Sequence, residues 1–156
     1  MDMKSMEKQI YDGDPNLIPK KDVSLIKIKL GKSHRKESDW AIIKEILTKH
    51  NVIVVEPKEP DPGIKVIKHV ICRNRFLYIF TNVEDCMRFV YMINIEDNKV
   101  GREFFVGSMP FESCVDIAKS KGLPMYIDNT YGENDRCMLY MPEDGSIKAV
   151  VTQKVY

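Results

Sequence analysis

The chain has 156 residues and a mass of 18.1 kDa, and 44% of the residues are hydrophobic, so it is long enough for one globular domain. Its 24 Lys and Arg against 23 Asp and Glu give a net charge of +1, which provides no general attraction to nucleic acid or to an anionic membrane. The opening segment MDMKSMEKQIYDGD contains no apolar run of the length that a secretion signal needs, and the later apolar runs are far shorter than a membrane helix. None of the four cysteines forms a CxxC pair, which suits reduced, buried thiols. We therefore expect a cytoplasmic protein that makes no contact with a membrane.

The first part of the chain is polar. Residues 1–22 are rich in polar residues with Gly and Pro, and we expect a flexible N-terminal arm there with little core, followed by one domain over residues 23–156. Val23–Leu30 (VSLIKIKL) places apolar residues against Ser and Lys in near alternation, which predicts a half-buried strand with a lysine-bearing outer face. Such a face is typical of an edge strand, and the sequence leaves open whether a second copy of the chain pairs with it.

A helix and three strands are predicted next. Ser38 is suited to be the N-cap of a helix over Asp39–His50, which has apolar residues at helical spacing. Val52–Glu56 is a β-branched run that ends in a proline-rich loop, and it predicts a strand. Val66–Arg73 and Phe76–Phe80 favour two strands of an antiparallel hairpin, with a short polar break between them.

The sequence predicts two more helices, with a strand between them. Thr81-Asn82-Val83-Glu84 matches a capping box and begins an amphipathic helix. Glu103–Val106 predicts a strand, and Pro110 opens a helix that Gly122 ends.

The end of the chain predicts a β meander. Met125–Asp128 is a short strand, and Arg136–Met141 and Ile147–Thr152 flank an Asp-Gly turn. The predicted order is therefore β-α-β-β-β-α-β-α-β-β-β in an α+β domain, with two to three helices packed on one face of a mixed β-sheet.

From about Trp40 to Val151, the sequence resembles the N-terminal domain of the SseB family, the bacterial proteins named for enhanced serine sensitivity. Three phrases carry the resemblance: YIFTNVEDCMRFV at 78–90, MPFESCVDIAKSKG at 109–122, and MYIDNTYGENDRCMLYMP at 125–142, which is similar to the family's strand, Asn-x-x-Gly loop and following strand. The basic segment before Ser38 has no counterpart in that pattern. The resemblance implies a fold and no particular reaction.

No catalytic or metal-binding motif in the sequence is complete. Gly31-Lys32-Ser33 matches the last three residues of a P-loop motif, but the first glycine of that motif would fall on Ile26. Cys86 and Cys114 lie on apolar helix faces, where a thiol is a packing residue. The three histidines lie in different predicted elements, and the segment 128–133 departs from a calcium loop in the place of its glycine. We therefore propose no catalytic residue, no metal site and no cofactor.

A local basic excess lies near the N-terminus. Residues 1–37 carry nine Lys or Arg and six Asp or Glu, a net of +3, and no aromatic residue for base stacking lies between Asp12 and Asp39. The basic residues concerned are Lys20, Lys21, Lys27, Lys29, Lys32, Arg35 and Lys36. Nucleic-acid binding through this segment is the weakest of the three functions considered, because so small an excess is typical of a solvated surface.

The loop Asn129–Asp135 is the best candidate for recognition. Tyr131 is flanked there by Asn129, Gly132 and Glu133, an aromatic residue among polar ones, as at many recognition surfaces. The alternative is a structural turn with Gly132 at positive φ. The leading hypothesis is a non-enzymatic module that binds an unidentified protein partner through this loop and the nearby helix starts at Asn82 and Phe111. The alternative is a small-ligand-binding protein or an enzyme whose site is assembled from distant loops.

Overall fold

The computed structural model describes residues 2–30, 37–128, 135–140 and 148–153. Its helices are α1 (Met3–Gly13), α2 (Lys20–Leu30), α3 (Glu37–Thr48), α4 (Val83–Glu96) and α5 (Phe111–Lys121). Its strands are β1 (Asn51–Pro57), β2 (Lys65–Ile67), β3 (Val70–Arg73), β4 (Phe76–Ile79), β5 (Phe104–Pro110), β6 (Met125–Ile127), β7 (Asp135–Tyr140) and β8 (Lys148–Gln153). The predicted α+β class is confirmed.

The region before α3 differs most from the sequence prediction. Val23–Leu30 belongs to helix α2, so the predicted edge strand is wrong, and with it the strand edge that a second copy could have joined. The helix begins where the carbonyl of Pro19 accepts the N–H of Val23 at 3.0 Å, and Asp22 in the first turn favours the helix dipole. The near alternation of apolar and polar residues in this segment suggested a strand. It is broken at Leu25 and Ile26, which are consecutive apolar residues, and of these two only Ile26 is fully buried.

Residues 1–22 contribute more to the core than the sequence predicted. Helix α1 begins at the N-cap Asp2, whose carboxylate accepts the N–H of Ser5 at 2.8 Å. Leu17 and Ile18 are only 3% and 1% exposed, so the expectation of little core in this segment is wrong. The flexibility of this arm and the single domain over residues 23–156 stay predictions.

Strands β2, β3 and β4 are joined by two tight turns. Lys68 and His69 have φ of 47° and 74°, and Asn74 and Arg75 have φ of 54° and 67°. Two consecutive positive φ values are typical of the two-residue turns that match the twist of a hairpin. The sequence predicted the second turn but treated β2 and β3 as one strand, because neither Lys68 nor His69 is a usual turn residue.

The three helices predicted after residue 38 are confirmed. The start of α4 is one residue later than the capping box suggested, since Asn82 is the N-cap and its Oδ1 accepts the N–H of Asp85 at 2.8 Å. Helix α5 ends at Gly122, whose φ of 65° is the left-handed conformation that glycine adopts at helix ends.

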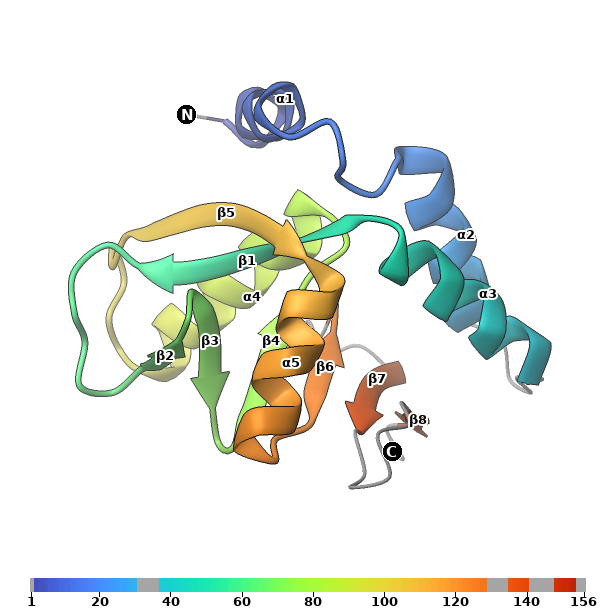
Figure 1. Ribbon diagram of the computed structural model, residues 1–156. Coiled ribbons are helices and arrows are strands. Elements are labelled where there is room, and N and C mark those ends of the chain that lie inside the picture. The colour runs from blue at the N-terminus through green and yellow to red at the C-terminus, as the bar shows by residue number, and fades with distance from the viewer. Residues whose placement is uncertain (1, 31–36, 129–134, 141–147, 154–156) are drawn as a thin grey trace.

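The main sheet has six strands in the order β2-β3-β4-β6-β7-β8, in which β4 and β6 are parallel and the other neighbours are antiparallel. Strands β1 and β5 form a separate antiparallel pair, which a bridge between Ile53 and Phe80 joins to the end of β4. Helices α4 and α5 cover opposite faces (Figure 1), so the expectation that the helices pack on one face is wrong.

The core has one part on each side of the sheet. On the α5 side Phe111 packs with buried residues of α3, β1 and β4, and on the α4 side Phe89 stacks on Tyr78 with ring centroids 4.7 Å apart. Burial of apolar surface on both faces holds the sheet rigidly between the helices. Among the helices that the structure describes, none has the length and apolar character needed to cross a membrane.

Candidate functional site

The parallel strands β4 and β6 end at the same edge of the sheet, and polar side chains gather there. Asp128 follows β6 directly, and its N–H donates to the carbonyl of Ile79 in β4 at 3.0 Å. One carboxylate oxygen of Asp128 accepts the N–H of Thr81 at 2.7 Å, and the other accepts the Thr81 hydroxyl at 2.6 Å. In open α/β sheets the carboxyl ends of parallel strands are a usual place for a binding site.

The first turn of α4 adds a second carboxylate. Asn82, the N-cap, donates from Nδ2 to Asp85 Oδ2 at 2.8 Å and to Thr81 Oγ1 at 3.1 Å. A carboxylate in the first turn of a helix is favoured by the positive end of the helix dipole. Asp85 is thereby fixed beside Asp128.

Lys27 reaches this place from α2. Its Nζ donates to Asp85 and lies 3.5 Å from Asp128 Oδ2. The side chain of Lys27 is 42% exposed, whereas those of Asp85 and Asp128 are 8% and 3% exposed. We call Lys27, Thr81, Asn82, Asp85 and Asp128 the strand-end cluster.

The electrostatics of the cluster follow from two buried carboxylates that share one ammonium group. Burial raises the pKa of Asp128, and the charge of Asp85 adds to this, while Lys27 and the Thr81 hydrogen bonds act in the opposite direction. For Lys27, burial acts to lower the pKa, but the charges of Asp128 and Asp85 outweigh it and the pKa is raised. The cluster therefore holds the lysine firmly charged and makes the ionised form of Asp128 costly.

The predicted recognition loop begins at this cluster. Asn129, Tyr131, Gly132 and Glu133 lie outside the described residues, but the residue before them is Asp128. The predicted helix start at Asn82 is part of the cluster, so the structure places that helix start beside Asp128, while the contact role of the loop itself stays a prediction. Phe111, the other predicted helix start, is 1% exposed and packs in the core, so its side chain offers no contact to a partner.

Of the strand-end cluster, only Asn82 was predicted from the sequence as a contact residue. Lys27 was placed in the basic segment, on the outer face of a predicted strand, and Asp128 at the end of a strand and in an incomplete calcium loop, while Asp85 was given no role. The one signal in the sequence is an acidic residue at each of two strand ends, at Asp128 and within the turn of helix that follows β4. The lysine that joins them lies 58 positions before Asp85 and carries no such signal.

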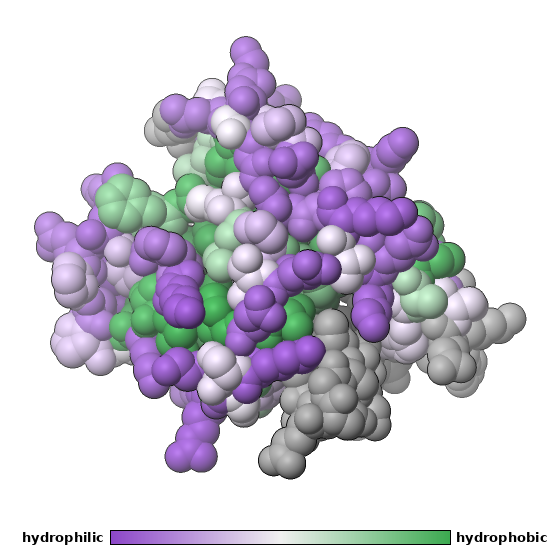
Figure 2. All heavy atoms as spheres, in the orientation of Figure 1, coloured by the Kyte–Doolittle hydropathy of each residue, from purple (hydrophilic) through white to green (hydrophobic). Residues whose placement is uncertain are grey.

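A separate apolar hollow lies beside β1 and β5. It has a volume of about 170 Å³ and is lined by Val54, Glu56, His69, Phe105, Gly107 and Met109, among others. His69 Nδ1 and Glu56 Oε1 are 2.7 Å apart at its rim, and Phe105 is 55% exposed. Figure 2 shows hydrophobic side chains gathering on the face of the molecule that carries α5.

The cysteines and histidines of the described residues do not converge. Cys72, Cys86 and Cys114 are free and buried, and burial raises the pKa of the Cys114 thiol to about 12. His50, two residues after the end of α3, has its Nδ1 2.7 Å from the carbonyl oxygen of Ile46. No group of three or more His, Cys, Asp or Glu side chains that could hold a metal ion occurs in the part of the chain that the structure describes.

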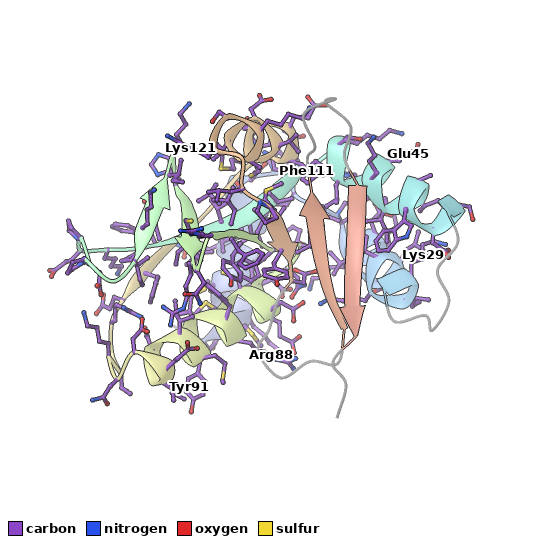
Figure 3. The ribbon with its side chains drawn as sticks, turned by 90° about the horizontal axis from the view of Figure 1, so that it is seen from below. Lys29, Glu45, Arg88, Tyr91, Phe111 and Lys121 are labelled. Carbon is purple, nitrogen blue, oxygen red and sulfur yellow. The ribbon has the colours of Figure 1, made fainter. Side chains whose placement is uncertain are left out.

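The basic segment is largely occupied by ion pairs where it is described. Lys20 pairs with Glu7, and Lys29 Nζ donates to Asp39 Oδ1 at 3.0 Å. Figure 3 shows Lys29 on the side of α2 that is turned to α3. Together with Lys27, three lysines of the predicted basic set are partly neutralised by carboxylates. Gly31-Lys32-Ser33, His34, Arg35 and Lys36 lie outside the described residues.

A second charged network has a structural role. Arg102 donates to Asp61 at 2.8 Å and to Asp97 at 2.9 Å, and Arg73 donates to the same Asp97 at 2.6 Å. These bonds tie the loop before β2 and the strand β3 to the end of α4.

Comparison of the chain with protein-family models, with curated proteins and with solved structures finds no match.

Proposed function

We propose that the chain is a bacterial, cytoplasmic, SseB-like module that is non-enzymatic and binds a protein partner. The contact surface in this proposal consists of the loop Asn129–Asp135 and the start of α4 at Asn82. The resemblance of residues 40–151 to the SseB N-terminal domain supports the family assignment. The buried free thiols of Cys72, Cys86 and Cys114 suit a reducing compartment.

One observation carries the proposal. Asp128, the residue before the loop, accepts two hydrogen bonds of 2.7 and 2.6 Å from Thr81, next to the N-cap Asn82. A loop that directly follows a residue fixed on a rigid sheet edge can present its side chains to a partner at a lower entropic cost. Tyr131 is the side chain in this loop that would bury the most apolar surface.

The test is a quantitative capture experiment from a lysate of the producing cells with three baits: wild type, Tyr131→Ala and Tyr91→Ala. Tyr91 is a matched control because it is 66% exposed and projects from the outer face of α4 (Figure 3). We expect a partner that wild type and Tyr91→Ala retain equally and that Tyr131→Ala loses at least about tenfold. Equal retention by all three baits, or no enriched protein with wild type, contradicts the proposal. Circular dichroism establishes beforehand that the three baits are equally folded.

The strand-end cluster supports one alternative, a small-ligand-binding protein or an enzyme. Lys27, Asp85 and Asp128 come from three distant segments and meet as buried or half-buried titratable groups whose charges interact, an arrangement common at functional sites. The apolar hollow beside β1 and β5 holds none of these residues. A screen of small cationic and anionic metabolites by thermal shift separates the two proposals. Stabilisation that is lost in Asp128→Asn favours the ligand site.

A further inference from the structure

Strand β5 pairs with β1 along one edge and with no other strand among the described residues. Where the pairing begins, Lys58 donates its N–H to the carbonyl of Glu103 at 2.9 Å. Backbone hydrogen bonds alternate along an antiparallel pair, so the odd-numbered residues of β5 bond to β1. The even-numbered residues point their N–H and C=O groups to the outer edge, and these are Phe104, Val106 and Ser108. Figure 1 shows β5 as the outer strand of the pair, with α5 running from its end away from that edge.

The outer edge of β5 lacks the features that usually protect an edge strand. Its sequence is FFVGSMP, which contains no charged residue and has its one proline at the last position. Strand β2, at one end of the main sheet, has three residues and carries Lys65, as protected edges often do. An uncharged edge of seven residues is suited to the addition of another strand.

Helix α1 lies near this edge, on the α4 side. Its residues Met6, Ile10 and Tyr11 pack with the half of the core on that side. The opposite side of the edge is open, because Phe105 is 55% exposed and a methyl group added at Gly107 would meet nothing within 4 Å. A strand that is added on the outer edge would therefore lie beside exposed residues of β5 on the α5 side.

The apolar hollow beside β1 and β5 lies on this open side. Val54 and Met109 pack with the α5 half of the core, and alternate residues of a strand share a face, so Phe105 and Gly107 lie on the same side. Because Gly107 has no side chain, the hollow stays open between Phe105 and Met109, with a volume of about 170 Å³. A cavity of about 150 Å³ is large enough to hold a benzene ring. Within its own chain, the Phe105 ring has the Lys58 ammonium 5.6 Å from its centroid.

We propose that a second copy of the chain pairs with β5 along this edge, in antiparallel direction and with Val106 on the two-fold axis. In this register Phe104 faces Ser108 of the second copy and Val106 faces its own equivalent, so the outward backbone groups of all three residues are bonded. The result is a continuous sheet in the order β1-β5-β5-β1.

The hollow selects this register. With Val106 on the axis, Phe105 of each copy faces Gly107 of the other, at a non-hydrogen-bonded pair where side chains lie closest. An aromatic ring placed across from a strand glycine covers the backbone that the glycine exposes, and here it fills the hollow. A register centred on Phe105 or on Gly107 places that residue opposite itself and leaves the hollow empty. The inference does not rest on the proposed function, because β5 shares no residue with the strand-end cluster or the loop 129–135.

Sedimentation velocity over a concentration series tests the pairing. Two strand edges make a small interface, so we expect a reversible dimer that forms between about 10 μM and 0.5 mM. Phe105→Ala should raise the dissociation constant of the dimer at least about tenfold, because the hollow then stays empty. Tyr91→Ala is the matched control, since it removes an aromatic side chain that is 66% exposed on another element. Wild type that is still monomeric at about 0.5 mM, or a dimer that Phe105→Ala leaves unchanged, overturns the proposal.

A mixture of two variants tests the register. Gly107→Leu places a side chain in the hollow from its own strand, where the monomer has open space, and should weaken the dimer as Phe105→Ala does. In the mixture, Phe105 of the Gly107→Leu variant faces the intact Gly107 of the Phe105→Ala variant, and the new leucine faces the new alanine. We expect the mixture to dimerise at concentrations at which each variant alone is monomeric. No gain of dimer in the mixture overturns the proposal.

A disulfide tests the position of the two-fold axis with Phe105 and Gly107 both intact. Facing residues of a hydrogen-bonded antiparallel pair have Cα atoms about 5.5 Å apart, which suits a disulfide. Val106→Cys should therefore form a linked dimer under mild oxidation. Val100→Cys, at an 83% exposed position outside β5, and wild type with its native cysteines are the controls. Linkage that is no faster in Val106→Cys than in Val100→Cys overturns the proposal. Circular dichroism establishes beforehand that every variant is folded.

Discussion

Asp128 shows how a single residue can link the fold to a surface. It has a positive φ of 52°, which is uncommon for a residue with a side chain, and its carboxylate binds the backbone and hydroxyl of Thr81. This conformation turns the chain sharply at the end of β6, where the loop 129–134 begins. The sequence could not predict this role, because an Asp after a strand is also an ordinary turn residue.

The raised pKa of Asp128 predicts a pH dependence of stability. The folded state binds the Asp128 proton more tightly than the unfolded state does, because the pKa of Asp128 in the unfolded chain is near the ordinary 3.8. The stabilising contribution of protonated Asp128 is therefore fully present below pH 3.8. It is lost as the pH rises through the raised pKa of the folded state. Asp128→Asn does not titrate and keeps an acceptor for the Thr81 N–H. The free energy of unfolding of this variant, measured by urea denaturation, should therefore rise relative to wild type over that window. A difference that is constant or falls with pH contradicts this reasoning.

The carboxyl group of Asp97 should titrate at unusually low pH. The hydrogen bonds from Arg73, and to a smaller extent those from Arg102, lower its pKa from 3.8 to about 2. Carbon-detected NMR titration should show this value in wild type and a value closer to 3.8 in Arg73→Met. Arg88→Met, which affects an exposed pair with Glu84, should leave the Asp97 titration unchanged. An unchanged titration in Arg73→Met would show that the network does not hold in solution.

Helices and strands were predictable where local signals and tertiary packing agree. Helix α5 has Pro110 before it, apolar residues at helical spacing and Gly122 after it, and both of its ends were predicted. Helix α2 was mistaken for a strand because the exposed apolar residues Leu25 and Ile28 obscure the helical spacing of Val23 and Ile26, which pack in the core. Of the two turns that join β2, β3 and β4, only the second was predicted, since Asn74 is a usual turn residue and Lys68 is not.

The end of α5 gives a direct test at the scale of the element. In Gly122→Ala the residue keeps a φ near 65°, which costs a residue with a side chain about 1 to 2 kcal/mol. Gly13→Ala is the matched control, since Gly13 has no positive φ and a methyl group there meets nothing within 4 Å. Urea denaturation should show a loss for Gly122→Ala and none for Gly13→Ala. Equal effects would mean that the left-handed cap is not required.

At the scale of the whole molecule, residues of the N-terminal segment pack in the core beside the sheet. Leu17 bridges Asn51 at the start of β1, and Ile18 packs with residues of the α5 side. This packing was not predictable from the sequence, because two apolar residues in a polar segment form no period. Of the strand-end cluster, only Asn82 was predicted as a contact residue, since Lys27 and Asp85 meet through tertiary structure alone; the role of the loop stays a prediction.

The burial of Ile18 predicts a large effect from a residue in a segment expected to be a flexible arm. Ile18→Ala removes a side chain that is 1% exposed and should cost about 2 to 4 kcal/mol. Ile28→Ala is the control, since Ile28 is 66% exposed and should change stability by less than about 0.5 kcal/mol. Urea denaturation of both variants provides the comparison. A cost below about 1 kcal/mol for Ile18→Ala would mean that this segment does not pack as described.

The central claim is that the strand-end edge and the loop after it form the binding surface. The most direct measurement is hydrogen exchange of the wild-type chain with and without the partner recovered by capture. The account predicts new protection over residues 81–85 and 128–135 when the partner is bound. Protection confined to the hollow beside β1 and β5, or to the outer face of α4 near Tyr91, would contradict it.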